Sequence, residues 1–454
     1  MRNLSKFFLL LFAASTFGLF TSCNDDEMTD GGDPMSSDNP AEIIAAYFDD
    51  AKNINTDPGF TSGFMPMNDL GDVCDTGTGT DATDYKGAVA PTGTPWYTGW
   101  SSYENILNGG GTRSFTVGNI VTIQDSDMSE AGDVVNWTND NTYVLDGIVF
   151  VNEGQTLNIE AGTVIQGKPG EAANASALVV ARGGTIMAIG NASEPIVFTF
   201  EGDTGLTQPT ERGRWGGLII LGDASLNSDP GESAIEGIDT NEARGLYGGE
   251  NDSDNSGVIK YVSIRHGGTN IGADNEINGL TLGGVGTGTT VEYVEVVGNK
   301  DDGVEWFGGT VNTKYILSIF CADDGLDYDE GYRGKNQYLI VHQDPADSAA
   351  DRGGEHDGGT NPEEGTPYAT PTFTNLTSIG NSGSRALTFR DNAGGEYYNS
   401  IFINYGRGID IEDIVGQDQD SYKQFQDANL RLECNVFWNV AAGTTGAELF
   451  TITN

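Results

Sequence analysis

Short runs of apolar and β-branched residues, separated by turn residues, dominate residues 140–454. Residues 144–167 (VLDGIVFVNEGQTLNIEAGTVIQG) and 177–200 (ALVVARGGTIMAIGNASEPIVFTF) show the pattern, with Gly, Asn and Asp between the runs. Runs of this kind are typical of short β-strands joined by tight turns. The pattern therefore predicts an all-β fold for most of the chain.

The runs recur with a period of 22–23 residues. Tyr293, Tyr315 and Tyr338 each open a similar run, and they lie 22 and 23 residues apart. Residues 318–331 (SIFCADDGLDYDEG) also resemble residues 400–413 (SIFINYGRGIDIED). With two or three strands per turn, this period indicates a parallel β-helix, because a propeller blade needs about 40–45 residues. The three tyrosines should occupy equivalent places on stacked coils.

The residues before this solenoid have a different character. Residues 41–51 (AEIIAAYFDDA) carry apolar groups at helical spacing, which predicts a short helix. Residues 52–115 are rich in Gly, Thr, Asp and Pro and show no period. We therefore interpret residues 41–139 as a helix followed by an irregular N-terminal cap.

An aromatic cluster lies within this cap, at Trp96, Tyr97 and Trp100. Aromatic rings can stack on sugar rings, which makes these residues candidates for ligand binding. The alternative, which we favour, is that they pack onto the end of the solenoid and shield its first coil.

The first residues resemble an export signal. Arg2 and Lys6 precede an apolar stretch at residues 7–20, which is too short to span a membrane comfortably. Small residues then lead directly to Cys23, as in the signal peptide of a bacterial lipoprotein. We predict cleavage that removes residues 1–22 and acylation of Cys23, whose acyl chains would anchor the protein in a membrane.

We predict an acidic, flexible tether over residues 23–40. It begins with Asn-Asp-Asp-Glu at 24–27 and is rich in Asp, Gly, Ser and Pro, a composition that buries little apolar surface. An acidic run directly after a lipidated cysteine is similar to the surface-export signal of Bacteroidota lipoproteins. That resemblance implies an outer-membrane lipoprotein on the cell surface.

The formal net charge of −45 narrows the set of partners. A chain this acidic repels nucleic acid and anionic lipid surfaces, which excludes both. The carboxylates serve either solubility, the interpretation we favour, or the binding of divalent cations.

Three cysteines remain besides Cys23, namely Cys74, Cys321 and Cys434. They are too few for a disulfide framework in a chain of this length. Their odd number means that at least one should stay free and buried, and the sequence leaves the pairing open.

Two acidic turns form the strongest candidate site, and they lie 22 residues, or one coil, apart. Stacked coils lie about 4.8 Å apart, so equivalent carboxylates would face each other and repel. A Ca²⁺ ion would reverse the sign of that interaction. The alternative, which we favour, is ordinary turn chemistry with side chains splayed into water. The candidate calcium ligands are Asp301, Asp302, Glu305, Asp323, Asp324, Asp327 and Asp329.

A segment at about residues 343–372 interrupts the period and should protrude as an inserted loop. It contains Arg352 and His356, which are candidates for ligand binding because such insertions often form binding faces. The alternative, which we favour, is a solvated loop.

The first coils of the predicted solenoid resemble a known family. Residues 140–265, through GQTLNIEAGTVIQG, GGTIMAIGNASEPIVFTF, RWGGLIILGDASLN and DNSGVIKYVSIRHGG, resemble right-handed β-helix surface lipoproteins of Bacteroidota. The resemblance implies a right-handed solenoid and a place beside a TonB-dependent outer-membrane receptor. The expected function is therefore a non-catalytic binding module in nutrient capture.

Two other functions stay open: a carbohydrate-active enzyme of the polysaccharide-lyase kind, and a structural or adhesive surface protein. A lyase needs a cation or basic group to neutralise a uronate, and a base to abstract a proton. The sequence contains no lyase motif that we recognise and no Ser-His-Asp arrangement. We therefore assign no catalytic residue and favour a protein that is not an enzyme.

The first prediction concerns Cys23. Mass spectrometry of the mature N-terminus should find an acylated Cys23, because the apolar stretch ends in Thr-Ser-Cys. A Cys23→Ala variant should keep its leader and lose the lipid mass. An unmodified Cys23, or cleavage at another position, would refute the prediction.

Overall fold

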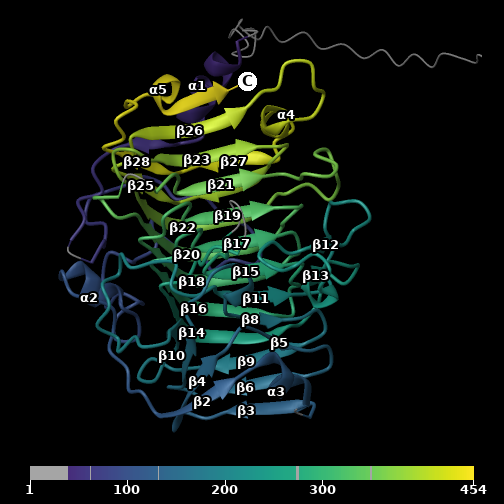
Figure 1. The fold of residues 1–454 in the computed structure, drawn as a ribbon. Helices are drawn as coiled ribbons and strands as arrows, with labels where there is room; N and C mark the ends of the chain where they lie inside the picture. Colours follow the sequence, from purple (N-terminus) through teal and green to yellow (C-terminus); the bar gives the residue numbers. More distant parts are fainter. Residues whose placement is uncertain (1–38, 62, 131, 272–275, 348–349, 454) are drawn as a thin grey trace, which may run out of the picture.

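The chain forms a parallel β-helix, as the period predicted (Figure 1). A computed structural model describes residues 39–453, except 62, 131, 272–275 and 348–349; the predicted signal peptide and nearly all of the predicted tether lie outside this range. Parallel strands stack coil upon coil as in a right-handed β-helix. Among the described residues, sheet A has 17 strands and sheet B has 10.

Sheet B carries the site described below. Its strands, in stacking order, are β5 (Ile148–Val151), β8 (Ala177–Val180), β11 (Leu218–Leu221), β15 (Leu280–Gly283), β17 (Val304–Phe307), β19 (Leu326–Asp329), β21 (Gly354–Asp357), β23 (Arg385–Arg390), β26 (Arg407–Glu412) and β29 (Phe450–Thr453). A two-stranded hairpin, β12 (Ser233–Ala234) and β13 (Leu246–Tyr247), lies within the insertion after β11.

Sheet A forms the rest of each coil. Its strands are β1 (Ile54–Asn55), β2 (Asn119–Ile123), β3 (Val134–Trp137), β4 (Asn141–Leu145), β6 (Thr156–Ile159), β7 (Val164–Gly167), β9 (Thr185–Ile189), β10 (Ile196–Phe200), β14 (Gly257–Arg265), β16 (Thr290–Val297), β18 (Asn312–Ile319), β20 (Lys335–His342), β22 (Thr372–Ile379), β24 (Gly395–Tyr398), β25 (Ile401–Ile403), β27 (Leu430–Glu433) and β28 (Val436–Trp438).

The helices are short and lie outside the sheets. They are α1 (Pro40–Asp50), α2 (Tyr103–Leu107), α3 (Asp125–Glu130), α4 (Ser421–Gln426) and α5 (Gly446–Leu449), with single 3₁₀ turns at Ala172–Asn174 and Ala243–Gly245. None of the helices in the described part of the chain is long and apolar enough to cross a membrane.

In-register stacking of aliphatic side chains builds the core. Val262, Val294, Ile316, Leu339 and Leu376 occupy one register position on five successive strands of sheet A, and none is more than 1% exposed. Each coil thus buries its apolar face against the same face of the next coil. This explains why the hydrophobic period of the sequence equals the length of a coil.

A second stacked row consists of the tyrosines that defined the period. Tyr261, Tyr293, Tyr315 and Tyr338 have φ values of 53°, 55°, 60° and 62°. This left-handed conformation is unfavourable for a bulky residue and bends each long strand. The rings stack with successive centroid distances of 4.4, 4.3 and 5.0 Å, which offsets part of that strain. The prediction that Tyr293, Tyr315 and Tyr338 are equivalent is confirmed.

Residues 52–115, here called the N-terminal strap, run along the side of the solenoid and do not cover its first coil (Figure 1). The described part of the chain begins at the opposite end, where α1 packs against α5 and β29, and β1 extends sheet A beside β28. The expected position of the cap is therefore wrong. The reason is that the tyrosine row forms an apolar ridge across four strands of sheet A on which the strap packs, and the sequence pattern did not reveal this contact.

The aromatic cluster of the strap packs on this tyrosine row. The Trp96 ring lies 5.4 Å from Tyr315, and the Trp100 ring lies 5.7 Å from Tyr261. Tyr97 and Trp100 are only 2% and 1% exposed. Tyr97 and Trp100 are therefore buried in the interior of the protein, where they cannot stack on a sugar ring.

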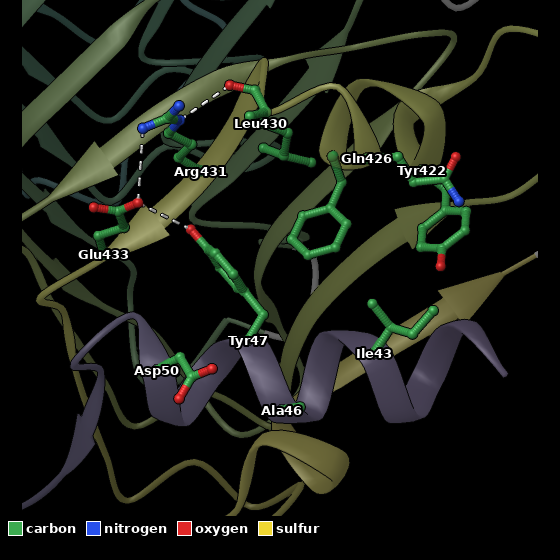
Figure 2. Close-up of a pocket in the computed structure, with 11 residues that line it drawn as sticks. Ile43, Ala46, Tyr47, Asp50, Tyr422, Gln426, Leu430, Arg431 and Glu433 are labelled. Atoms are coloured by element: carbon green, nitrogen blue, oxygen red, sulfur yellow. Dashed lines mark hydrogen bonds and ion pairs between the residues drawn. The ribbon is translucent and has the colours of Figure 1, made fainter. Parts of the chain in front are cut away.

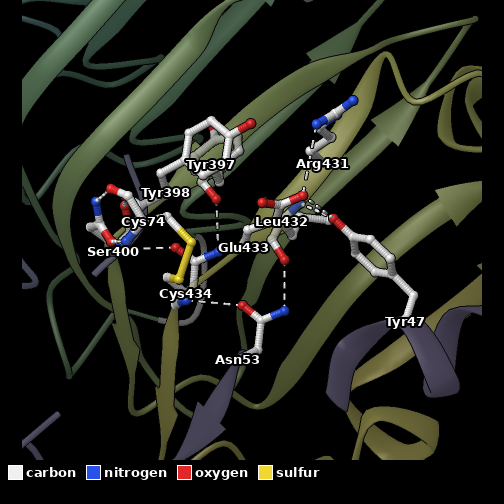
Figure 3. Close-up of a disulfide and its surroundings, with 12 residues drawn as sticks. Tyr47, Asn53, Cys74, Tyr397, Tyr398, Ser400, Arg431, Leu432, Glu433 and Cys434 are labelled. Atoms are coloured by element: carbon white, nitrogen blue, oxygen red, sulfur yellow. Dashed lines mark hydrogen bonds and ion pairs between the residues drawn. A yellow bond between two sulfur atoms is a disulfide. The ribbon is translucent and has the colours of Figure 1, made fainter. Parts of the chain in front are cut away.

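A disulfide between Cys74 and Cys434 ties the strap to the turn between β27 and β28, across 360 residues of sequence (Figure 3). The Asn53 side chain supports this turn, since its amide donates to Leu432 O at 2.6 Å and its oxygen accepts from Asn435 N at 2.9 Å. Cys321 is free and buried. The expectation of one free, buried cysteine is confirmed.

Reduction of this disulfide should destabilise the protein, because the bond closes a very long loop. Replacing Cys74 and Cys434 together by Ser should lower the free energy of unfolding by about 2–5 kcal/mol. Thermal unfolding with and without dithiothreitol measures the effect. The reductant should lower the melting temperature of the unmodified protein and leave that of the double variant unchanged; equal melting curves for the unmodified protein in both conditions would contradict the prediction.

Candidate metal centre

The outer face of sheet B is divided into an apolar part and a charged part. On β8 and β11, the outward residues Val179, Ile219 and Leu221 pack under the insertion that contains Ile235 and Tyr247. From β17 onwards the outward residues of sheet B are mostly polar or charged. Glu305, Asp327, Glu355, Thr388 and Asp410 follow one another in register on β17, β19, β21, β23 and β26.

The acidic end of this face surrounds a cavity of about 150 Å³. One wall is the strand row just described, and the other is the turn that precedes each strand. In these turns the coils are joined by backbone hydrogen bonds, from Gly279 N to Asp302 O and from Gly303 N to Asp324 O, both 3.0 Å. The cavity is lined by Glu236, Asn278, Asp301, Asp302, Glu305, Asp323, Asp324, Asp327 and Glu355.

Six of the seven carboxylates predicted as calcium ligands therefore meet at one cavity. The exception is Asp329, which lies at the far end of β19, where it accepts hydrogen bonds from Glu330 N and the Thr360 hydroxyl. Three lining residues were not predicted. Asn278 and Glu355 precede or follow the acidic turns by about one coil, a signal that was present, whereas Glu236 comes from the insertion and has no periodic signal at all.

Key side chains of this cluster are withdrawn from water. Asp302, Asp324 and Glu305 are 6%, 1% and 7% exposed. The favoured expectation that the carboxylates splay into water is therefore wrong for Asp302, Asp324 and Glu305, which the flanking turns and the Glu236 segment cover, whereas Asp323 is exposed. Among the described residues, Asp324 Oδ1 and Asp327 Oδ1 are buried without a hydrogen-bond partner. An unpaired, buried carboxylate oxygen is costly unless a cation or proton satisfies it.

Burial and mutual repulsion shift the titration of the cluster upwards. Burial, followed by the charges of Glu236 and Asp323, raises the pKa of Asp301 to about 8. The pKa values of Asp302 and Asp324 are raised well above the usual range, first by burial and then by neighbouring carboxylates. Without a cation, burial and mutual repulsion therefore favour the protonated forms of these carboxyl groups.

The oxygen atoms are close enough to share cations. Asp302, Glu305 and Asp327 offer oxygens that all lie within 4.8 Å of one another, and so do Asp324, Asp327 and Glu355. A third set joins Asp301, Asp302 and Asp323. The donors are carboxylate oxygens with one nearby amide, a set that suits a hard cation such as Ca²⁺ and not a thiolate-seeking or imidazole-seeking metal. The residues present therefore fit calcium.

Two arginines bound the cluster on the side of β21 and β23. Arg352 Nη2 lies 3.1 Å from Glu355, and its Nη1 lies 3.7 Å from Asp324. Arg390 contacts Glu355 at 2.9 Å and Asp357 at 2.6 Å. The pKa values of both guanidinium groups are raised. Burial alone would lower them, but the attraction of the neighbouring carboxylates has the larger effect. Arg352 and Arg390 are therefore permanent cations that cannot accept a proton.

The prediction of an inserted loop around Arg352 and His356 is wrong for residues 354–357. These residues form β21 and continue sheet B. Strand alternation turns His356 into the solenoid, where it is 0% exposed and stacks 4.2 Å from the Tyr328 ring. Burial lowers the pKa of His356 to about 3. Arg352 reaches the cavity edge, whereas His356 is a neutral core residue that no ligand on the outer face can contact.

The sequence of residues 128–453 matches the family of pectate-lyase-like β-helix domains. The chain belongs to this family. No curated protein matches the chain. Among solved structures, the Streptococcus pneumoniae surface protein and adhesin PfbA is similar at 10% identity, over 73% of this chain and 100% of that chain, with a TM-score of 0.16. That similarity carries no function over to this chain. Membership of the pectate-lyase-like family supports the fold, and the function has to be inferred from the residues of the site.

The metal-free protein should lose stability as the pH rises from about 4 to about 8. The pKa of Asp301 is about 8 in the folded protein, which is above its value in the unfolded chain. Protonation of Asp301 therefore stabilises the folded state. This stabilisation is fully present below the unfolded pKa and is lost as the pH rises through the folded pKa. We expect the loss to be at least about 1 kcal/mol.

Melting temperatures in chelator at a series of pH values measure this slope. The double variant Asp302→Asn and Asp324→Asn should flatten it. As a control of equal net charge, Asp72→Asn with Asp418→Asn changes two exposed positions and should leave the slope intact. Equal slopes for both double variants would show that the cluster does not cause the pH dependence.

Proposed function

We propose that this pectate-lyase-like β-helix is a lipid-anchored, surface-exposed binding module that holds Ca²⁺ on sheet B. The bound cation, together with Arg352 and Arg390, would bind an oxygen-rich ligand such as a carbohydrate, for nutrient capture beside a TonB-dependent receptor. The observation that carries the proposal is the cavity lined by eight carboxylates, in which Asp324 Oδ1 and Asp327 Oδ1 are buried without a partner.

The energetics of the cluster support a bound cation. Two unit charges about 5 Å apart repel by roughly 3 kcal/mol at an effective dielectric constant near 20. Several such pairs meet between the coils of β17, β19 and β21, where Arg352 and Arg390 oppose them directly. A divalent cation converts these repulsions into attractions and satisfies the unpartnered oxygens.

The position of the site supports ligand binding. The cavity opens on the outer face of sheet B, beyond the insertion that covers the lower strands. A calcium ion held there by protein oxygens on one side can complete its six to eight ligands with hydroxyl or carboxylate groups of a ligand on the other side.

The basic groups at the site support binding without catalysis. A lyase needs a base that is neutral at the working pH. Carboxylates hold both Arg352 and Arg390 in the charged form, and His356 points into the core. Among the described residues that line the cavity there is no Lys or His.

Cleavage of an acidic polysaccharide is the second candidate function, favoured by membership of the pectate-lyase-like family and by the pairing of a candidate cation site with two arginines. An ultraviolet assay for unsaturated products on polygalacturonate with calcium separates the two functions. The binding proposal expects calcium-dependent binding of an oxygen-rich polymer without product; calcium-dependent product formation that is lost in Asp302→Asn would establish the lyase instead.

Calcium should stabilise the protein, because it binds the folded state alone. At a calcium concentration of about 100 times its dissociation constant, the gain is about 2.7 kcal/mol. We expect a corresponding rise in melting temperature, which Asp302→Asn with Asp324→Asn should abolish. That variant, without metal, should be equally or more stable than the unmodified protein, because repulsion is relieved.

The control for this experiment is again Asp72→Asn with Asp418→Asn, which should keep the full calcium effect. Isothermal titration calorimetry at two pH values adds an independent readout. Because carboxyl groups with raised pKa values must release protons when calcium binds, the affinity should fall as the pH falls. Identical melting curves in calcium and in chelator would end the proposal of a metal centre.

A further inference from the structure

A second cavity, of about 500 Å³, lies at the C-terminal end of the solenoid, between α1, α4 and β27 (Figure 2). Its walls are mostly apolar. Ile43, Ala46 and Tyr47 line it from α1, and Tyr422, Phe425 and Leu430 line it from the opposite side. The size and the apolar lining are those of a site for an apolar ligand. This α1–α4 pocket is distant in the fold from the acidic face, since it is built on the last strands of sheet A.

Helix α1 has apolar residues on two faces, and only one of them is covered. Ile44 and Phe48 are 0% and 3% exposed, and the Phe48 ring packs 5.6 Å from those of Phe437 and Phe450. This face fixes the helix on the end of the solenoid. The other face turns toward the pocket, where Ile43 and Tyr47 are half-buried and Ala46 is exposed. An apolar group that filled the pocket would complete the burial of α1.

One end of the pocket is polar. The Tyr47 hydroxyl accepts a hydrogen bond from Leu432 N at 3.1 Å and donates one to Glu433 at 3.5 Å. Arg431 lies 4.0 Å from the same carboxylate. Figure 2 shows these polar groups together at one side, with Ile43 and Tyr422 at the other. An occupant should therefore be a long aliphatic group that lies along the apolar wall, with no charge to place in it.

We propose that the α1–α4 pocket binds one of the acyl chains attached to Cys23 of the same molecule. This inference rests on the lipidation of Cys23 proposed above. Asn39, the first described residue, lies only 16 positions after Cys23 and directly precedes α1. A segment of that length spans at most roughly 55 Å, so an acyl chain on Cys23 can reach a pocket formed by α1 itself.

The short connection makes the binding intramolecular. Attachment through a short linker gives an effective concentration on the order of millimolar. In water, each methylene that enters the pocket leaves an unfavourable environment, so the pocket should be occupied whenever no bilayer is present. A bilayer buries all the acyl chains at once, so membrane insertion should empty the pocket. The pocket would thus shelter the anchor while the protein moves through water.

The test uses the full lipoprotein, made in a bacterial host that is fed a fatty acid carrying a diazirine and an alkyne. The purified protein is irradiated free of detergent, and cross-linked peptides are identified by mass spectrometry. We expect the chain on Cys23 to cross-link to peptides of α1 and of residues 422–433. After transfer to phosphatidylcholine vesicles, these cross-links should fall by about tenfold, in line with a shift of population to the bilayer.

Two variants of α1 form a matched pair. Ala46→Trp places a large ring in the pocket from an exposed position and should reduce the cross-links about tenfold, because the acyl chain is displaced. Glu42→Trp adds the same ring at an exposed position of α1 that does not line the pocket and should leave the cross-links unchanged. Circular dichroism and the calcium-induced rise in melting temperature confirm that both variants are folded.

The outcomes separate the two proposals. A labelled Cys23 whose cross-links are equal in both variants, or spread over the surface, overturns the pocket proposal and leaves the lipid anchor standing. An unlabelled Cys23 overturns both. A host phospholipid found in the pocket of the unmodified protein, with Cys23 labelled but not cross-linked there, also overturns binding of the protein's own acyl chain.

Discussion

The stacking of coils at the spacing of one β-strand is the constraint on which the rest of the structure depends. It places equivalent residues of successive coils in contact, so each register position becomes a row of similar side chains. Rows of aliphatic residues such as Val262, Val294 and Ile316 gain from this contact by burial. Rows of tyrosines gain by ring stacking. A row of carboxylates gains nothing unless a cation or proton joins it.

The N-terminal strap follows from the same constraint. A row of tyrosines in the left-handed conformation leaves an apolar ridge along sheet A, and Trp96 and Trp100 cover it. The described part of the chain starts with α1 at the C-terminal end of the solenoid, descends with the strap and returns coil by coil (Figure 1). The disulfide from Cys74 to Cys434 therefore joins the strap to the last coils of the solenoid.

The acidic cavity is a place where buried like charges destabilise the fold locally. Asp302, Asp324 and Glu305 are buried beside one another, and their pKa values are raised. Sites that combine burial with like charges are frequent at functional positions. The pectate-lyase-like fold supplies the flat outer face of sheet B, and the insertion with Glu236 encloses one end of it. The α1–α4 pocket lies apart from this face, so the proposed ligand binding and the proposed binding of an acyl chain would not compete for surface.

The sequence alone determined the solenoid and the alignment of the acidic turns, because a 22-residue period links residues such as Asp302 and Asp324 in any parallel β-helix. It also indicated a free cysteine. Only the tertiary structure decided that these carboxylates are buried, that Glu236 joins them, that His356 lies in the core, and which cysteines pair. These features depend on insertions and on contacts across hundreds of residues. A periodic pattern describes neighbouring coils, and it contains no information about segments that leave the period and return elsewhere.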